Sequence, residues 1–238
     1  MELPREREIA LVVRSERPAD VLERIAADRA LGPYRLDPLP EQAIEDVYLD
    51  TRDEALHALD LVLRRRRVDG ETLLTVKGRT QGGPRGPERV ELEQPWSADA
   101  LTETLAAVGA PPLGESDLRP VQERETLRTR RAVVDDARTL AELALDRVRF
   151  RSPAQAVLYE LEIEARHPAG DPAALAELLR AEHDELAPWP FSKLATGKAI
   201  AGTGVTGEVT AGILERLGTW LSSPRHRETP PPSRPSAR

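Results

Sequence analysis

The chain has 238 residues, of which 39% are hydrophobic, which is enough for one core of ordinary domain size followed by a tail. It contains no cysteine, which excludes disulfides and thiolate metal sites, and its net charge of −7 argues against a nonspecific nucleic-acid surface. No apolar run approaches the ~20 residues needed to cross a bilayer, and the N-terminus lacks the features of a signal peptide. We therefore expect a cytoplasmic protein with no membrane or nucleic-acid partner.

Eight segments alternate polar and apolar residues with the period of two that is typical of strands. They lie at about 5–14, 45–50, 59–68, 71–79, 86–95, 125–136, 139–151 and 155–167. Asp69-Gly70 between two of them is a strong hairpin signal, and Gly82-Gly83-Pro84 and Asp135-Asp136 indicate two further turns.

Three segments have helical spacing of their apolar residues. The first is 18–31, the second follows Ser97 as its N-cap, and the third begins at Asp171-Pro172. Many short strands with few helices predict a closed barrel or a sandwich with its helices outside.

The composition changes after Gly202, which suggests where the domain ends. Residues 204–221 have a modest amphipathic pattern, and 222–238 are rich in Pro, Ser and Arg and are predicted to be disordered. The prediction is therefore one domain over 1–203, an amphipathic helix over 204–221 and a disordered tail.

Like charges recur at every second residue in five of the predicted strands. Since residues i and i+2 of a strand point to the same face, each set lies on one face. The sets are Glu6 and Glu8; Arg64 and Arg66; Glu91 and Glu93; Arg128 and Arg130; and Glu160, Glu162 and Glu164. A single pair is most simply a solvated strand face. Five such sets are harder to explain in this way. In a closed barrel the apolar residues Leu92, Leu161 and Ile163 between the carboxylates must face outer helices, which predicts that the charges face the lumen.

Such a lumen has a definite chemistry. Paired carboxylates favour a hard divalent cation, which prefers oxygen ligands. Paired arginines favour phosphate, which guanidinium groups bind in a bidentate, charge-assisted way. Together they predict a site for a metal-complexed polyphosphate.

The order of these motifs resembles that of the CYTH domain family, also called triphosphate tunnel metalloenzymes, over about residues 4–202. The matching segments, in chain order, are Glu6-Arg7-Glu8-Ile9-Ala10 (family ExExK), Asp46-Val47-Tyr48-Leu49-Asp50-Thr51 (YxDT), Leu63-Arg64-Arg65-Arg66 (LRxR), Leu74-Thr75-Val76-Lys77-Gly78 (TxKG), Arg89-Val90-Glu91-Leu92-Glu93 (RxExE), Arg128-Thr129-Arg130, Leu145-Asp146, Glu160-Leu161-Glu162, and Ser192-Lys193 with Gly197-Lys198 (SKxxxG). The resemblance implies an α+β fold, an eight-stranded antiparallel β-barrel with helices packed outside.

The resemblance also implies roles for individual residues. One or two Mg²⁺ or Mn²⁺ ions would be held by Glu6, Glu8, Glu91, Glu93, Glu160 and Glu162, with Glu164 as an alternative. The phosphates would be bound by Arg64, Arg66, Lys77, Arg89, Arg128, Arg130 and Lys193. Tyr48 would position the attacking water or serve as a structural residue, and Asp146 is either a luminal carboxylate or one at a strand end.

Ala10 departs from the pattern, because the family has a luminal lysine there. Loss of a group that assists proton transfer costs ~10²–10⁴-fold in rate, so binding would survive better than turnover. The leading hypothesis is a metal-dependent triphosphatase acting on inorganic triphosphate or a small organic triphosphate. The alternatives are a non-catalytic module that binds triphosphate or polyphosphate and, ranked lower, an adenylate cyclase of the same fold.

Overall fold

Eight antiparallel strands form a closed barrel in the computed structural model, which describes residues 3–79, 81–83 and 86–223. The barrel strands are β1 (Arg5–Val13), β3 (Tyr34–Asp50), β4 (Val62–Val68), β5 (Glu71–Lys77), β7 (Gly86–Pro95), β8 (Arg119–Asp135), β9 (Arg138–Ser152) and β10 (Ala156–Ala165). They follow the order β1-β10-β9-β8-β3-β4-β5-β7, and pairing of β7 with β1 closes the ring. The predicted barrel is confirmed.

Short strands extend this sheet at its margins. They are β2 (Ala30–Leu31), β6 (Gln81–Gly83), β11 (Leu186–Pro188) and β12 (Gly207–Glu208). Two single turns of 3₁₀ helix, η1 (His57–Leu59) and η2 (Glu115–Asp117), lie in the connections.

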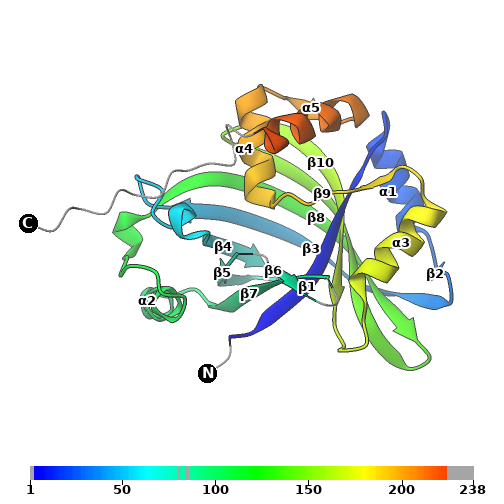
Figure 1. Cartoon of the computed structure of the whole chain (residues 1–238), viewed down its shortest axis with the longest axis horizontal. Helices are drawn as coiled ribbons and strands as arrows, with labels where there is room; N and C mark the ends of the chain where they lie inside the picture. The colour runs from blue at the N-terminus through cyan, green and yellow to red at the C-terminus, as the bar shows by residue number, and fades with distance from the viewer. Residues whose placement is uncertain (1–2, 80, 84–85, 224–238) are drawn as a thin grey trace, which may run out of the picture.

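The described residues contain five α-helices, all outside the barrel (Figure 1). They are α1 (Pro18–Ala26), α2 (Ala98–Ala107), α3 (Pro172–Glu182), α4 (Lys193–Thr203) and α5 (Ala211–Ser222). The helices bury three apolar clusters. α1 and α3 cover outward-facing residues of β1, β9 and β10, and α2 covers those of β4 and β5. α4 and α5 instead cover residues that share the inward face of their strands, among them Val12, Val148 and Leu158. Because the outward-facing apolar residues meet α1, α2 and α3, the alternating polar residues face the lumen.

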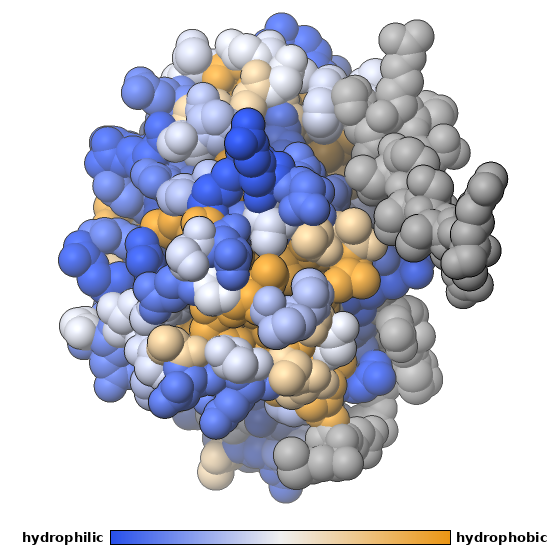
Figure 2. Space-filling model, turned by 90° about the vertical axis from the view of Figure 1, so that its left-hand side faces the viewer, coloured by the Kyte–Doolittle hydropathy of each residue, from blue (hydrophilic) through white to orange (hydrophobic). Residues whose placement is uncertain are grey.

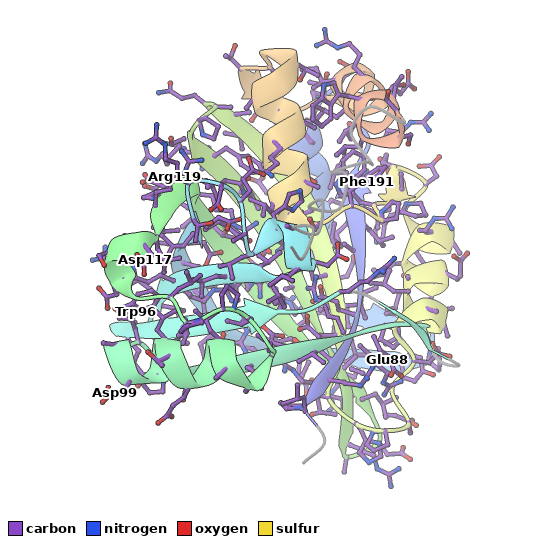
Figure 3. The ribbon with its side chains drawn as sticks, turned by 60° about the vertical axis from the view of Figure 1, so that its left-hand side comes forward. Glu88, Trp96, Asp99, Asp117, Arg119 and Phe191 are labelled. Carbon is purple, nitrogen blue, oxygen red and sulfur yellow. The ribbon has the colours of Figure 1, made fainter. Side chains whose placement is uncertain are left out.

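The caps of two helices agree with the predicted ones. The Ser97 hydroxyl accepts a hydrogen bond from the Ala100 N–H at the start of α2, and the Asp171 carboxylate accepts from the Ala173 and Ala174 N–H groups at the start of α3. Figure 3 shows Asp99 on α2, with Trp96 close to the strand that precedes it. Each cap satisfies N–H groups that the helix leaves unpaired.

Several element boundaries differ from the predicted ones. The first helix was predicted over 18–31 but ends at Ala26, because Gly32 takes a left-handed φ of 53° and turns Ala30 and Leu31 back as a strand against β3. The strand β3 extends over Tyr34–Asp50 rather than 45–50, and β8 begins at Arg119 rather than 125. None of the helices in the described ranges is long and apolar enough to span a membrane.

The last two described helices, α4 and α5, pack on the barrel. The predictions missed α4, whose buried residues include Thr196 and Gly197 and therefore give no clear apolar period. Within the segment predicted as an amphipathic helix, α5 begins only at Ala211, and it buries Leu214, Leu217 and Leu221 against the barrel. Most of the predicted tail, 224–238, lies outside the described residues, as does Pro84 of a predicted turn.

Candidate functional site

The barrel lumen contains a cavity of about 1270 Å³. Charged side chains from α4 and from every barrel strand except β3 line it, and β3 contributes Tyr48. All of the predicted carboxylates except Asp146 line it, namely Glu6, Glu8, Glu91, Glu93, Glu160, Glu162 and Glu164. All of the predicted cations line it too: Arg64, Arg66, Lys77, Arg89, Arg128, Arg130 and Lys193. Tyr48 and Ala10 complete this set. The fold thus brings together residues spread over nearly 190 positions of sequence. Figure 2 shows one end of the barrel, where apolar residues gather among charged ones.

The first group of charges joins β1, β5 and β7. The Lys77 ammonium lies 2.8 Å from a Glu6 oxygen and 3.1 Å from a Glu91 oxygen, while the Arg89 guanidinium donates to both Glu6 and Glu8. Burial and a hydrogen bond with Glu91 raise the pKa of Glu6. Burial acts to raise the pKa of Glu91 as well, but its hydrogen bond with Glu6 and the charges of Lys77 and Arg64 lower it. The Lys77 ammonium thus pairs with both the Glu6 and the Glu91 carboxylates.

The second group joins β8, β9, β10 and the first residue of α4. Arg128 donates to both oxygens of Asp146, at 2.7 and 2.6 Å, and to Glu162 at 2.6 Å. The Lys193 ammonium lies 2.7 Å from Glu162, 3.0 Å from Glu160 and 3.4 Å from Asp146. Asp146 is fully buried in the middle of β9, beside both cations but behind the cavity wall, so it is not a strand-end carboxylate.

Burial and the neighbouring charges set the pKa values of Glu160 and Glu162. Burial raises the pKa of Glu160, and its neighbours Glu162 and Asp146 act in the same direction. Burial also acts to raise the pKa of Glu162, but the Lys193 and Arg128 charges outweigh it and hold that pKa well below its usual range.

The third group contains two residues that the sequence reasoning missed. Asp46 on β3 accepts two hydrogen bonds from Arg66, at 2.8 and 3.0 Å, and two from Arg124 on β8, at 3.1 and 2.7 Å. The Arg64 Nε lies 3.6 Å from the same carboxylate. Burial acts to raise the pKa of Asp46, but the three guanidinium charges hold it well below its usual range. The guanidinium of Arg124 also lies over the ring of Tyr48, 5.2 Å from its centroid.

The remaining luminal charges lie nearer the margins of the cavity. Arg130 donates to both oxygens of Glu142, which is a third residue absent from the predictions. Glu93 accepts a hydrogen bond from the Thr75 hydroxyl at 2.9 Å. Glu164 on β10 is the register partner of Glu8 on β1, and burial, together with the charges of Glu6, Glu8 and Glu91, raises its pKa to about 7.

A sequence signal existed for the missed residues. Asp46 lies two positions before Tyr48, and Arg124 lies four before Arg128, so each shares a strand face with a predicted residue. Arg124 escaped prediction because the strand was expected to begin at 125. Glu142 lies four positions before Asp146 on the same face of β9.

The position of Ala10 is informative because it lines the cavity opposite Glu162, its register partner on β10. Its carbonyl accepts a hydrogen bond from the Trp189 N–H at 3.0 Å, which fixes the segment that leads into α4. Phe191 lies beside α4 in this segment (Figure 3). Lys193 lines the lumen, and its ammonium pairs with Glu162, the register partner of Ala10.

The donor chemistry of the lumen fits a divalent cation. Glu6 and Glu91 are crowded enough to hydrogen-bond to each other, and a hard cation accepts oxygen ligands of this kind. In the described ranges, no three acidic, His or Cys side chains already converge as a metal site. The carboxylates are instead paired with Lys77, Arg89 and Lys193, which a metal would have to displace.

The CYTH domain model matches residues 35–197, which is more than half of the chain, so the chain belongs to the CYTH domain family. No curated protein matches it significantly.

Among solved structures, the chain is similar to HpAC1 from Hippeastrum, described as a candidate adenylyl cyclase with a dominant triphosphatase activity. The identity is 19%, the TM-score is 0.58, and the match covers 84% of this chain and 96% of that one. It is also similar to a Bacillus halodurans protein provisionally described as an adenylate cyclase, with 17% identity, a TM-score of 0.52, and coverage of 79% and 95%. Both likenesses show the fold.

Proposed function

We propose that this protein is a Mg²⁺- or Mn²⁺-dependent triphosphatase that hydrolyses inorganic triphosphate or a small organic triphosphate inside the barrel. The observation that carries the proposal is the pairing of charges in the lumen. Each cation predicted to bind phosphate is paired with a carboxylate, and most of these carboxylates are the ones predicted to bind metal. A metal–triphosphate complex would give the cations phosphate oxygens to bind and the carboxylates a metal ion to bind. The descriptions of the similar structures, one of which names a triphosphatase activity, support the same reaction class.

The luminal residues would have two roles in such a reaction, phosphate binding and metal binding. The cations that line the cavity would bind phosphate oxygens; they are Arg64, Arg66, Lys77, Arg89, Arg128, Arg130 and Lys193. Glu6, Glu8, Glu91, Glu93, Glu160 and Glu162 would hold the cation, which when bound supplies charge neutralisation to the phosphates.

Water would be oriented from the cavity wall. Tyr48 lines the cavity, and its ring is held under Arg124, so its hydroxyl could hydrogen-bond a water beside a bound phosphate.

A second candidate function follows from Ala10. A lumen without the family lysine at this position would bind triphosphate or polyphosphate and turn it over slowly or not at all. Ala10→Lys separates the two functions. If the remaining groups are competent, we expect it to raise the rate of phosphate release at least tenfold. No gain, with binding retained, would favour the binding module.

The direct test is phosphate release from inorganic triphosphate with Mg²⁺ and with Mn²⁺. We expect release by the natural chain, loss of at least ~10²-fold in Glu91→Gln, and no change in Glu45→Gln, whose side chain is exposed on the outer face of β3. Product analysis after incubation with ATP tests the cyclase alternative. Absence of phosphate release from every triphosphate with either metal would refute the proposal.

A further inference from the structure

Arg124 is a fully buried, inward-facing arginine that does not line the cavity. Its side chain lies behind Tyr48 and beside Asp46, and only 2% of the residue is exposed. It uses Nε and Nη2 to donate to one oxygen of Asp46. A charged side chain buried this deeply costs free energy unless something in the structure requires it.

The carboxylate of Asp46 lies within ion-pair distance of three guanidinium groups. Arg66 binds it in a bidentate way, Arg124 binds it through two nitrogens, and Arg64 lies at ion-pair distance. One negative charge against three positive ones leaves these four residues with a formal charge of +2. The other carboxylates close to Arg64 are Glu91 and Glu93, each at 3.8 Å, and Glu91 is nearer to Lys77. The charge of Glu160 also acts on Arg124, but Glu160 forms its ion pair with Lys193.

The cluster also holds donors without acceptors. Nη1 of Arg124 and Nε of Arg64 are buried and have no hydrogen-bond partner. Unpaired buried donors are rare and cost free energy. Of the two residues, Arg64 lines the cavity, so the positive charge of the cluster reaches an anion there through Arg64 and Arg66, while Arg124 stays behind the cavity wall.

Asp46 has two opposing effects on this wall of the cavity. It fixes the Nε–Nη2 edge of Arg66, which orients that guanidinium at the cavity wall, but its charge neutralises part of the attraction for phosphate. Arg124 adds a positive charge on the far side of Asp46, where it does not occupy the cavity.

We propose that Arg124 is a positioning residue of the phosphate site, which acts through Asp46 by offsetting its charge so that Arg64 and Arg66 present a net positive charge to the bound triphosphate. The inference rests on the proposed function and adds the charge of this cluster as a determinant of triphosphate affinity.

Variants that change the cluster charge in steps test the inference. With the natural charge of +2, Arg124→Met leaves +1, Asp46→Asn leaves +3, and both Arg124→Lys and the double variant Asp46→Asn/Arg124→Met keep +2. The probe is inorganic tripolyphosphate, titrated calorimetrically at constant Mn²⁺. The matched control is Arg149→Met, which removes an exposed charge from β9.

The affinity for tripolyphosphate should rise with the positive charge of the cluster. We expect Arg124→Met to weaken binding roughly tenfold or more, Asp46→Asn to strengthen it, and the double variant and Arg124→Lys to bind within about threefold of the natural chain, as should Arg149→Met. If Arg124→Met does not fold, the other variants still test the order. A double variant or Arg124→Lys that loses tenfold, or an Arg124→Met that binds as the natural chain does, would overturn the inference. Absence of binding by the natural chain would instead overturn the proposed function.

Discussion

Glu164 provides a test of the crowding of carboxylates in the lumen. It lies on β10 opposite Glu8, and its oxygen is 2.7 Å from the Arg166 guanidinium, which acts to lower its pKa. Burial and the charges of Glu6, Glu8 and Glu91 outweigh Arg166 and raise the pKa to about 7 from 4.5. The folded protein therefore keeps a proton on Glu164 at pH values where the unfolded chain has released it.

The sign and the magnitude follow from this difference. Between pH 4.5 and about 7 the folded state binds more protons than the unfolded state, so this group makes the protein less stable as the pH rises through that window. The full shift corresponds to ~3 kcal/mol, and we reduce it to ~2 kcal/mol because the side chain is 30% exposed. Glu164→Gln removes the penalty.

Urea unfolding of both proteins in EDTA, at several pH values from 4.5 to 8, measures the effect. We expect Glu164→Gln to be more stable than the natural chain by ~2 kcal/mol at pH 8 and close to it at pH 4.5. Glu103→Gln, an exposed position on α2, should show no such dependence. A difference between Glu164→Gln and the natural chain that does not vary with pH would refute the reasoning.

Three further predictions follow from the same contacts. Because the luminal cations are paired with carboxylates, Mn²⁺ should lower the Kd of tripolyphosphate roughly tenfold, and tripolyphosphate should lower the Kd of Mn²⁺ by the same factor; calorimetric titration in both orders checks this, and independent binding would contradict it. Lys193→Met removes the ammonium that pairs with Glu160, Glu162 and Asp146. It should lower the free energy of unfolding in urea by ~3 kcal/mol, and an unchanged urea midpoint would contradict this role of the ion pairs. Gly197→Ala should lower the Tm, because its Cβ would lie 1.8 Å from the Gln122 Oε1; an unchanged Tm would show that Gln122 moves aside freely.

The barrel could be predicted from the sequence because its physical cause is local. Alternation of apolar and charged residues fixes which side of each strand meets the helices, as Leu161 and Ile163 do on β10. Long strands were harder to predict. The first half of β3 contains Pro38 and Pro40 and reads as a loop, and pairing with β8 keeps much of it extended.

The luminal residues could be predicted as a set but not as partners. Spacing placed Arg64 and Arg66 on one face, yet nothing local shows that Asp46 binds both, because that contact depends on the register of β3 with β4. The same holds for Lys193, whose three carboxylates come from β9 and β10 and meet it only when α4 packs on the barrel. Tertiary register, not sequence pattern, decides these contacts.

The central claim is that metal and triphosphate bind together inside the barrel. The most direct measurement is a crystal structure of the chain grown with Mn²⁺ and a non-hydrolysable triphosphate analogue, with the metal located by its anomalous scattering. We predict Mn²⁺ within coordination distance, about 2.0–2.4 Å, of luminal glutamate oxygens, with phosphate oxygens on Arg64, Arg66 and Lys193. Metal and analogue bound only outside the barrel, with the luminal ion pairs unchanged, would contradict the account.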